Sequence, residues 1–537
     1  AATSSPGRLL RQCGLRRLLR RERIIKRIDN LKIPVGIEDG KLYELVKKKA
    51  GGRLGYFKII KKSLDARNKD NIFWLYSVAY SAEKESENKP PLEKIENAPR
   101  VCVIGSGPAG LFCAVRLCER GYSPIILERG RNVDERIERV NTFFSKRILD
   151  ENCNVQFGEG GAGTFSDGKL NTQTKDGFNR DVLEIFARFG APEEILYLNK
   201  PHIGSDKLKP VLRNIRSYIE SCGGKFLFGK KFSGFSSENG ELRTIKYEDV
   251  ESGECDEIPV SAAVLAVGHS ARDTFEMLAA NGIAMEPRDF AVGVRTEHLS
   301  ESISFAQYGK NYKLLPAADY KLVSHAHERT VFTFCMCPGG VVIPAASERG
   351  GVVVNGMSDY ARNARNSNSA LMVQLKRGDF GEGLFDGMNF QRKIERLAYE
   401  AGGKNYCAPC QLFGDFAKGR ISERFGEVQP TYAAGVTFAP LAEVLPKVAV
   451  EALKVAIPDM DKKLKGFASP DCVLTGVETR FTSPVRILRG ADRQSVSLKN
   501  LYPCGEGSGY SGGITSSAAD GIRTAEYLYG MHRENNH

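Results

Sequence analysis

The stretch 101–130, VCVIGSGPAGLFCAVRLCERGYSPIILERG, limits what this chain can fold into more than any other part of the sequence. It starts with a short apolar run of the kind found in strands buried on both faces. Three glycines in G-x-G-x-x-G spacing follow, then a segment of helical composition, and then a second apolar run that ends in Glu128. In order, these pieces are 101–104, 105–110, 111–120 and 124–127. Their order predicts a strand–helix–strand unit.

Each glycine of the motif has a physical task in such a unit. Gly105 allows the tight turn from strand to helix, Gly107 lets a pyrophosphate approach the backbone, and Gly110 lets helix and strand pack closely. The pyrophosphate then lies at the positive end of the helix. Glu128, 18 positions beyond the last glycine, is placed to accept hydrogen bonds from an adenosine ribose. We therefore predict a dinucleotide site, to which neighbouring residues also contribute: Ser106, Pro108, Ala109 and Arg129.

Length and composition set the class of protein. A chain of 537 residues is too long for one simple core, so two or three domains are expected. A mean hydropathy of −0.30 is ordinary for a globular protein, and no apolar run is long enough to predict a membrane-spanning helix. The 13 cysteines are too few and too scattered for a disulfide scaffold, which favours a compartment with reduced thiols.

Much of the net charge of +12 comes from one segment near the start of the chain. Nine basic residues and one acid lie between Arg8 and Arg27, and the residues before them, AATSSPG, are rich in Ser, Thr and Ala. This composition is typical of an organelle-targeting segment or its remnant, and we assign it residues 1–29. It predicts an organellar location, for which the resemblance described below favours the plastid stroma, with a mitochondrion second and the cytoplasm as the alternative. A basic arm that touches nucleic acid or lipid, and an ordinary solvated helix face, stay open.

Residues 30–81 are predicted to form a small α+β domain. Three strands are expected at 31–35, 56–61 and 72–80, with a helix at 42–49. The charged, proline-bearing segment 82–99 then reads as a linker. A docking role for this domain toward protein partners is one expectation; no specific contact with nucleic acid is expected.

Three further glycine-bearing segments point to the same dinucleotide. Between 154 and 172, five glycines lie within eleven residues, and such a loop exposes backbone N–H groups to an anion, although a flexible surface loop is the alternative. The segment 262–270 reads as a small-residue strand, and 500–521 reads as a strand, a glycine turn and a helix. The residues predicted to contribute are Gly160, Gly161, Gly163, Ser166, Lys169, Gly268, Gly505, Glu506, Gly513, Ile514, Thr515 and Ser516.

Together these motifs resemble the flavoproteins with two dinucleotide-binding domains. More narrowly, NVQFGEGGAGTFSDGKL, PHIGSDKL, FTFCMCPGG, VVVNGMSDYARN and VETRFTSPVRILR resemble a largely uncharacterised family of FAD-dependent dehydrogenases found in bacteria and plastids. The resemblance spans roughly residues 30–530 and implies bound FAD. It departs at Glu506, where the broader superfamily usually has Asp.

The resemblance implies an α/β fold with a Rossmann-like FAD-binding core of the glutathione-reductase type. The core would be formed by residues 100–285 and 486–537, with an inserted substrate domain at 286–485. A second complete fingerprint is missing, which weighs against a separate NAD(P)H domain, although NAD(P)H could still bind transiently as a reductant. We expect an oxidoreductase that passes a hydride between FAD and a small anionic organic substrate. The alternative is an interaction protein in which FAD is mainly structural.

Candidate reactive groups each have a structural alternative. His202 could act as an acid–base or anion-binding residue, or simply hold a turn. Cys335 and Cys337 have C-x-C spacing, which on a regular strand turns both side chains to one face, and Cys337 is our catalytic candidate. Buried cysteines are also common packing material. Arg480 and Arg486 could grip a substrate carboxylate or phosphate, or pair with surface acids.

Two other constellations are weaker. Cys407 and Cys410 have the C-x-x-C spacing of dithiol redox centres, but the flanking sequence does not start a helix in a strand–helix–strand unit. His325 and His327 could share one face of a strand, yet no Cys or acid matches them, so we predict no metal site.

Overall fold

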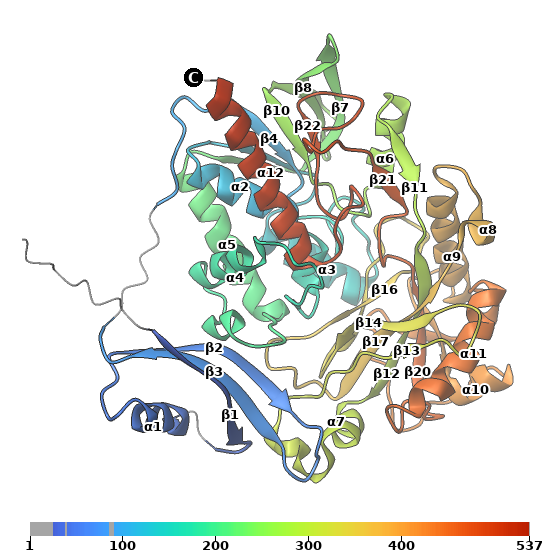
Figure 1. The fold of residues 1–537 in the computed structure, drawn as a ribbon. Coiled ribbons are helices and arrows are strands. Elements are labelled where there is room, and N and C mark those ends of the chain that lie inside the picture. Colours follow the sequence, from blue (N-terminus) through green and yellow to red (C-terminus); the bar gives the residue numbers. More distant parts are fainter. Residues whose placement is uncertain (1–24, 38–39, 85–90, 536–537) are drawn as a thin grey trace, which may run out of the picture.

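The computed structural model describes residues 25–37, 40–84 and 91–535 (Figure 1). The basic arm therefore falls almost wholly outside the described residues, and the linker falls partly outside them. Within these ranges, no helix combines the length and apolar character needed to cross a bilayer.

The N-terminal part forms the small α+β domain that the sequence predicts, at the lower left of Figure 1. An antiparallel sheet in the order β1–β3–β2 packs its apolar face against α1. The elements are β1 (Lys26–Pro34), α1 (Gly40–Lys49), β2 (Tyr56–Asp65) and β3 (Phe73–Ser81). At the edge of this sheet, Lys62 donates its N–H to the Tyr197 carbonyl at 2.7 Å and accepts from Asn199 at 2.9 Å, which ties the domain to the core.

The core is a five-stranded parallel sheet in the order β22–β10–β4–β5–β6, which confirms the Rossmann-like prediction. Its strands are β4 (Val101–Ile104), β5 (Ile125–Glu128), β6 (Lys225–Phe228), β10 (Ala262–Leu265) and β22 (Leu501–Pro503). The alternation along β4 separates two faces. Val101 and Val103 pack with helices, whereas Cys102 and Ile104 pack toward a second sheet.

The helical layer is α2 (Pro108–Glu119), α4 (Asn179–Arg188), α5 (Ser205–Ser221) and α12 (Ile514–Asn535). On the other face lies the antiparallel sheet β7–β8–β9, joined by α6 (Arg272–Ala280). Its strands are β7 (Lys230–Glu238), β8 (Glu241–Asp249) and β9 (Cys255–Pro259). The connecting elements are α3 (Val133–Lys146) and the 3₁₀ helices η1 (Gly161–Phe165) and η2 (Glu193–Leu196).

The inserted segment is built on a mixed seven-stranded sheet in the order β13–β14–β17–β12–β20–β18–β19. These strands are β12 (Ala291–Leu299), β13 (Val323–Ser324), β14 (Val331–Cys337), β17 (Asn366–Gln374), β18 (Ala408–Leu412), β19 (Val436–Phe438) and β20 (Val473–Glu478). Around it lie α7 (Ser300–Tyr308), η3 (Gly309–Leu314), α8 (Arg377–Phe380), α9 (Asp386–Ala401), α10 (Phe413–Lys418), η4 (Leu441–Glu443) and α11 (Lys447–Asp461), with the ribbon β15 (Val341–Pro344) and β16 (Val354–Met357).

The chain enters and leaves this segment through one antiparallel pair, β11 (Met285–Pro287) and β21 (Val485–Ile487). The predicted domain boundaries at 286 and 485 lie within this pair. The two crossings side by side place the seven-stranded sheet against the carboxyl edge of the parallel sheet.

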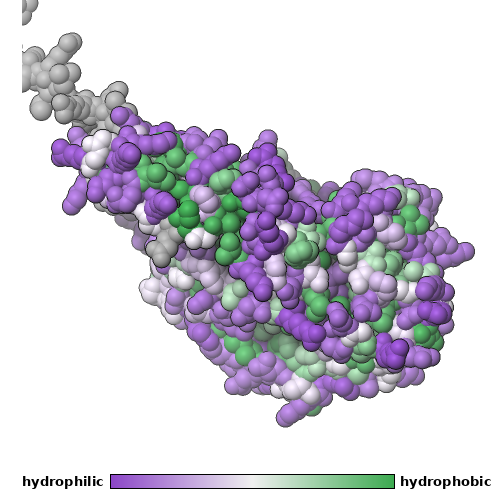
Figure 2. Space-filling model, turned by 90° about the horizontal axis from the view of Figure 1, so that it is seen from below, coloured by the Kyte–Doolittle hydropathy of each residue, from purple (hydrophilic) through white to green (hydrophobic). Residues whose placement is uncertain are grey.

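Figure 2 views the molecule from below, and hydrophilic residues cover much of this face, with hydrophobic residues in patches between them. Individual apolar side chains such as Phe305 and Leu314 are 57% exposed. Isolated exposures of this kind are ordinary on a protein surface.

Candidate functional site

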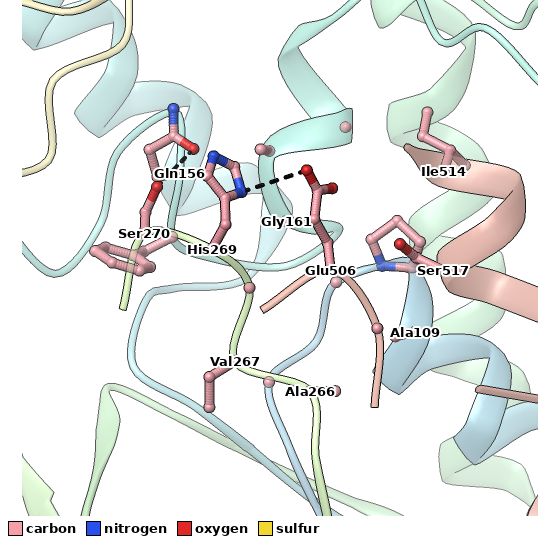
Figure 3. Close-up of a pocket in the computed structure, with 18 of the residues that line it drawn as sticks. Ala109, Gln156, Gly161, Ala266, Val267, His269, Ser270, Glu506, Ile514 and Ser517 are labelled. Carbon is pink, nitrogen blue, oxygen red and sulfur yellow. Dashed lines mark hydrogen bonds and ion pairs between the residues drawn. The ribbon is translucent and has the colours of Figure 1, made fainter. Parts of the chain in front are cut away.

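A cavity of about 340 Å³ opens where the strands of the parallel sheet end. The residues that follow β4, β5, β10 and β22 all line it, because parallel strands bring their carboxyl ends to one edge. Figure 3 shows several lining residues converging from these loops and from α12. The volume lies within the range of about 300–1,000 Å³ typical of ligand pockets.

The glycine turn between β4 and α2 has the geometry that the sequence predicts. Gly105 has φ +101°, and a Cβ at Gly110 would lie 1.9 Å from the Gly105 carbonyl oxygen, so strand and helix touch there. Gly110 thus shapes the turn without lining the cavity. Gly107, Pro108 and Ala109 do line it. No side chain caps the N-terminus of α2, which leaves its backbone N–H groups for an anion.

Glu128 joins the loops of this edge. Its Oε2 accepts from the N–H and hydroxyl of Ser106 at 2.9 and 2.7 Å, and its Oε1 accepts from the N–H groups of Gly130 and Gly158 at 2.9 and 3.0 Å. The residue is buried and lines the cavity. Arg129 lines it too, stacked over Phe157 at 4.3 Å from the ring centroid. Both residues predicted to bind the adenosine end therefore lie at the cavity.

The second glycine loop closes over the first. A Cβ at Gly161 would lie 2.9 Å from Gly107 Cα, so a glycine at 161 is needed for the loops to meet. Gly161, Gly163, Ser166 and Lys169 line the cavity. Gly160 lies outside the lining residues and instead donates its N–H to the Ser106 carbonyl at 2.8 Å.

The C-terminal turn supplies the opposite side. Gly505, Glu506, Gly513 and Ile514 line the cavity at the start of α12. Two predicted contacts lie outside the lining and make structural bonds. Thr515 donates its hydroxyl to the Leu170 carbonyl at 2.8 Å, and the Ser516 hydroxyl donates to the Gly512 carbonyl at 2.7 Å.

Gly268, a predicted cofactor contact, lines the cavity, and so does the next residue, His269, which the sequence analysis did not single out. Its Nδ1 lies 3.9 Å from Glu506 Oε1, as Figure 3 shows, and its Nε2 has no hydrogen-bond partner among the described residues. Burial, with Arg480 and Arg272 nearby, lowers the pKa of His269 to about 3. Burial raises the pKa of Glu506 to about 7. A neutral imidazole thus faces a carboxyl group that can hold a proton near neutral pH. The sequence did carry a signal for His269, because this residue follows the small-residue strand directly.

The inserted sheet forms the remaining wall. Phe334 and Phe481 meet edge to face, with ring centroids 4.5 Å apart, and Arg480 lies beside them. Arg480 Nε and Nη2 donate to Glu395 at 2.9 and 3.0 Å, while Nη1 has no hydrogen-bond partner within the described ranges. The other lining residues of this wall are Cys335, Asn355 and Glu478. The structure thus places Arg480 at the cavity with one buried donor, Nη1, that is without a partner among the described residues.

Arg486, the second predicted substrate residue, is not brought there. It lies outside the lining residues, where its guanidinium pairs with Glu286 at 3.0 Å.

His202 is also placed outside the lining residues. Its Nε2 lies 3.0 Å from the Tyr360 carbonyl oxygen, and its ring stacks on the Tyr360 ring. Burial, with Arg362 nearby, lowers the pKa of His202. The structure therefore gives this residue the turn-holding surroundings of the structural alternative, and an acid–base role stays a prediction without a place at the cavity.

The C-x-C prediction needs correction in its geometry. The register of β14 against β17 shifts between Phe334 and Cys337, and Cys335 has φ +42°. The two thiols therefore do not follow the regular alternation of a strand. Cys335 lines the cavity, whereas Cys337 lies fully buried behind it. The bulge could not be read from the spacing.

The remaining constellations lie away from the cavity. Cys407 and Cys410 are both buried at β18, where a spacing of three on a strand turns side chains to opposite faces. His325 lies 3.3 Å from the Thr330 hydroxyl, and His327 accepts from the Arg329 N–H. No cluster of metal-ligating side chains occurs among the residues that the structure describes.

The fold and the cavity together define a Rossmann-like dinucleotide-binding protein with an inserted domain. A sequence model of the family "FAD-dependent protein, C-terminal domain-like" matches residues 289–481. An uncharacterized protein of Clostridium beijerinckii is 47% identical over 493 residues, which cover 88% of this chain and 91% of that protein. The chain therefore belongs to this family of FAD-dependent proteins.

Two solved structures are similar to this chain at low sequence identity. The glycerol-3-phosphate dehydrogenase from Bacillus halodurans complexed with FAD is 11% identical with a TM-score of 0.36, over 82% of this chain and 66% of that chain. A geranylgeranyl bacteriochlorophyll reductase-like protein from Thermoplasma acidophilum is 11% identical with a TM-score of 0.36, over 82% and 79% of the two chains.

Proposed function

We propose that the protein is an FAD-dependent oxidoreductase that passes a hydride between FAD and a small anionic organic substrate. The observation that carries the proposal is the composition of the cavity. A dinucleotide-binding edge forms one side, and a wall from a separate sheet, with a buried guanidinium donor and two aromatic rings, forms the other.

The fit of FAD rests on this chain's own residues. Gly107 and Gly161 leave the backbone bare beside the uncapped N-terminus of α2, where a pyrophosphate would bind. Glu128 and Arg129 would hold the adenosine end, and the start of α12 would face the flavin carbonyls. When bound, FAD supplies two-electron hydride chemistry.

The remaining groups would act on the substrate. Arg480 and Lys169 line the cavity and would bind an anion, while Phe334 and Phe481 would exclude water. Glu506 is placed to hold or release a proton at its carboxyl oxygen, since burial raises its pKa to about 7. NAD(P)H is proposed as a transient reductant, and protein partners at the N-terminal domain and a plastid location remain proposals.

The test is anaerobic mixing of the FAD-loaded protein with NADH, NADPH and a panel of small carboxylic acids. We expect at least one reductant to remove the absorbance of oxidised flavin at about 450 nm. Arg480→Met should raise the apparent Kd for an acid by about 10-fold or more. Arg486→Met, a matched change outside the cavity lining, should leave it unchanged. A flavin that none of these compounds reduces would favour the alternative of a structural FAD.

A further inference from the structure

The bulge in β14 places a strained cysteine at the cavity. Phe334 pairs with Ala370 and Cys337 pairs with Asn368, so β14 holds one more residue than β17 over this stretch. Cys335 has φ +42°, in the left-handed region that non-glycine residues rarely adopt. Strain of this kind collects at functional sites. Here it sets the Cys335 side chain apart from the regular strand and into the cavity wall.

The second thiol lies directly behind the first. Cys337 Sγ is 3.3 Å from the Cys335 carbonyl oxygen, and both residues are free thiols. The Cys337 thiol also hydrogen-bonds the Cys335 thiol. Two residues along a regular strand span about 6.6 Å between Cα atoms, which is within the upper limit of about 6.8 Å for a disulfide. The pair therefore lies within reach of an S–S bond.

A buried guanidinium, that of Arg295, contacts both residues of the pair. Arg295 is fully buried and donates from Nη1 and Nη2 to the Cys335 carbonyl at 3.2 and 3.0 Å, and its Nη2 lies 3.8 Å from Cys337 Sγ. A Cβ at Gly356 would lie 2.1 Å from Nη2, so that glycine leaves the guanidinium its place. Glu478 balances the charge, with an Nε to Oε2 distance of 3.2 Å.

The surroundings make the two thiols unequal. A hydrogen bond from the Cys337 side chain, with the positive charges of Arg295 and Lys169, lowers the pKa of Cys335 to about 7. The same contact raises the pKa of Cys337 well above its ordinary value. Thiol–disulfide chemistry needs one thiolate that is accessible and a resolving thiol beside it. Cys335 and Cys337 meet that requirement, and they do so in the cavity that would hold the flavin.

We propose that Cys335 and Cys337 form a redox-active dithiol that exchanges two electrons with FAD bound in the same cavity. This rests on the proposed function, because the bound FAD is the electron acceptor. The two thiols together lose two electrons and two protons as one bond forms between their Sγ atoms. FAD takes up the two electrons and two protons and becomes FADH₂. The reverse transfer restores both thiols.

The test is an anaerobic dithionite titration of the air-oxidised, FAD-loaded protein. The wild type should take up four electrons per FAD before the flavin is fully reduced, two for the disulfide and two for the flavin. Cys335→Ser and Cys337→Ser should each take up two. Cys255→Ser, which changes an exposed cysteine elsewhere, should behave as the wild type. A wild type that is fully reduced by two electrons would overturn the proposal.

A second measurement needs no variant. Mass spectrometry after iodoacetamide treatment in denaturant, which exposes the buried Cys337, should find both cysteines of the pair unmodified in the oxidised protein and both alkylated after reduction. Alkylation of both before reduction would overturn the dithiol. Neither outcome is confused with a failure of the proposed function, since a protein that retains no flavin after loading fails at the absorption spectrum instead.

Discussion

Glu128 shows how one side chain can organise a binding edge. Its carboxylate accepts from the β4–α2 turn, from its own loop and from the second glycine loop. We expect Glu128→Ala to raise the Kd for FAD by about 10- to 100-fold, because the loops lose their common acceptor and the ribose loses its own. Flavin fluorescence during titration of the apoprotein measures this. Glu254→Ala, at an exposed position, is the control. Equal affinities for the two variants would contradict the role of Glu128.

The pH dependence of stability tests Glu506. Its pKa is raised from 4.5 to about 7 by burial, so the folded state holds a proton that the unfolded state releases between these values. The favourable contribution is complete below pH 4.5 and is lost as pH rises through about 7. In the apoprotein, the free energy of unfolding of Glu506→Gln, taken relative to that of the wild type, should therefore rise by about 2 kcal/mol from pH 5 to pH 8. Urea unfolding at both pH values measures it, and a constant difference would refute the assignment.

At the residue scale, local spacing predicted some site residues and could not predict others. Glu128 and Gly107 belong to one continuous motif, so their spacing fixes their place. The position of Cys335 in the cavity wall depends on the bulge of β14 against β17, which the sequence does not reveal. The sequence also could not show that Arg480 lines the cavity and Arg486 does not, because this depends on how the inserted sheet packs. Pairing between strands far apart in sequence decides such cases.

At the scale of elements, the crossing of α12 and α2 holds the two ends of the core together. A Cβ at Gly521 would lie 2.1 Å from the Ala109 carbonyl oxygen, so the helices touch backbone to backbone. We expect Gly521→Ala to cost about 2 kcal/mol or more of unfolding free energy and to weaken FAD binding. Gly530→Ala lies on the same helix, with no atom within 4 Å of the added Cβ, and should be neutral or stabilising by up to about 1 kcal/mol. Chemical denaturation compares the two, and equal stabilities would contradict the close crossing.

The elements that the sequence predicted well are each formed by one continuous stretch of the chain. The unit from β4 to β5 and the strands of the N-terminal domain each carry their own hydrophobic period. The sheet β7–β9 was not predicted, because its strands are only half-buried and their partners are set by contacts with the parallel sheet. The segment 262–270 was expected as one strand, yet β10 ends at Leu265 and leaves Gly268 and His269 in the loop at the cavity.

At the scale of the molecule, the cavity lies between two bodies of the fold, and FAD would bridge them. Ligand binding to the folded state alone stabilises it by about 2.7 kcal/mol at 100 times the Kd. We expect FAD removal to lower the Tm by several degrees and FAD addition to restore it. Differential scanning calorimetry of the apoprotein with and without FAD measures this. Riboflavin is the control, since it lacks the pyrophosphate that the glycine turn would hold. An equal shift with riboflavin would contradict the placement of the dinucleotide.

The most direct measurement is the absorption spectrum of the purified protein after incubation with FAD and removal of free flavin on a desalting column. We predict one FAD per chain, with the absorption bands of oxidised flavin at about 375 and 450 nm. A colourless protein after this treatment would contradict it.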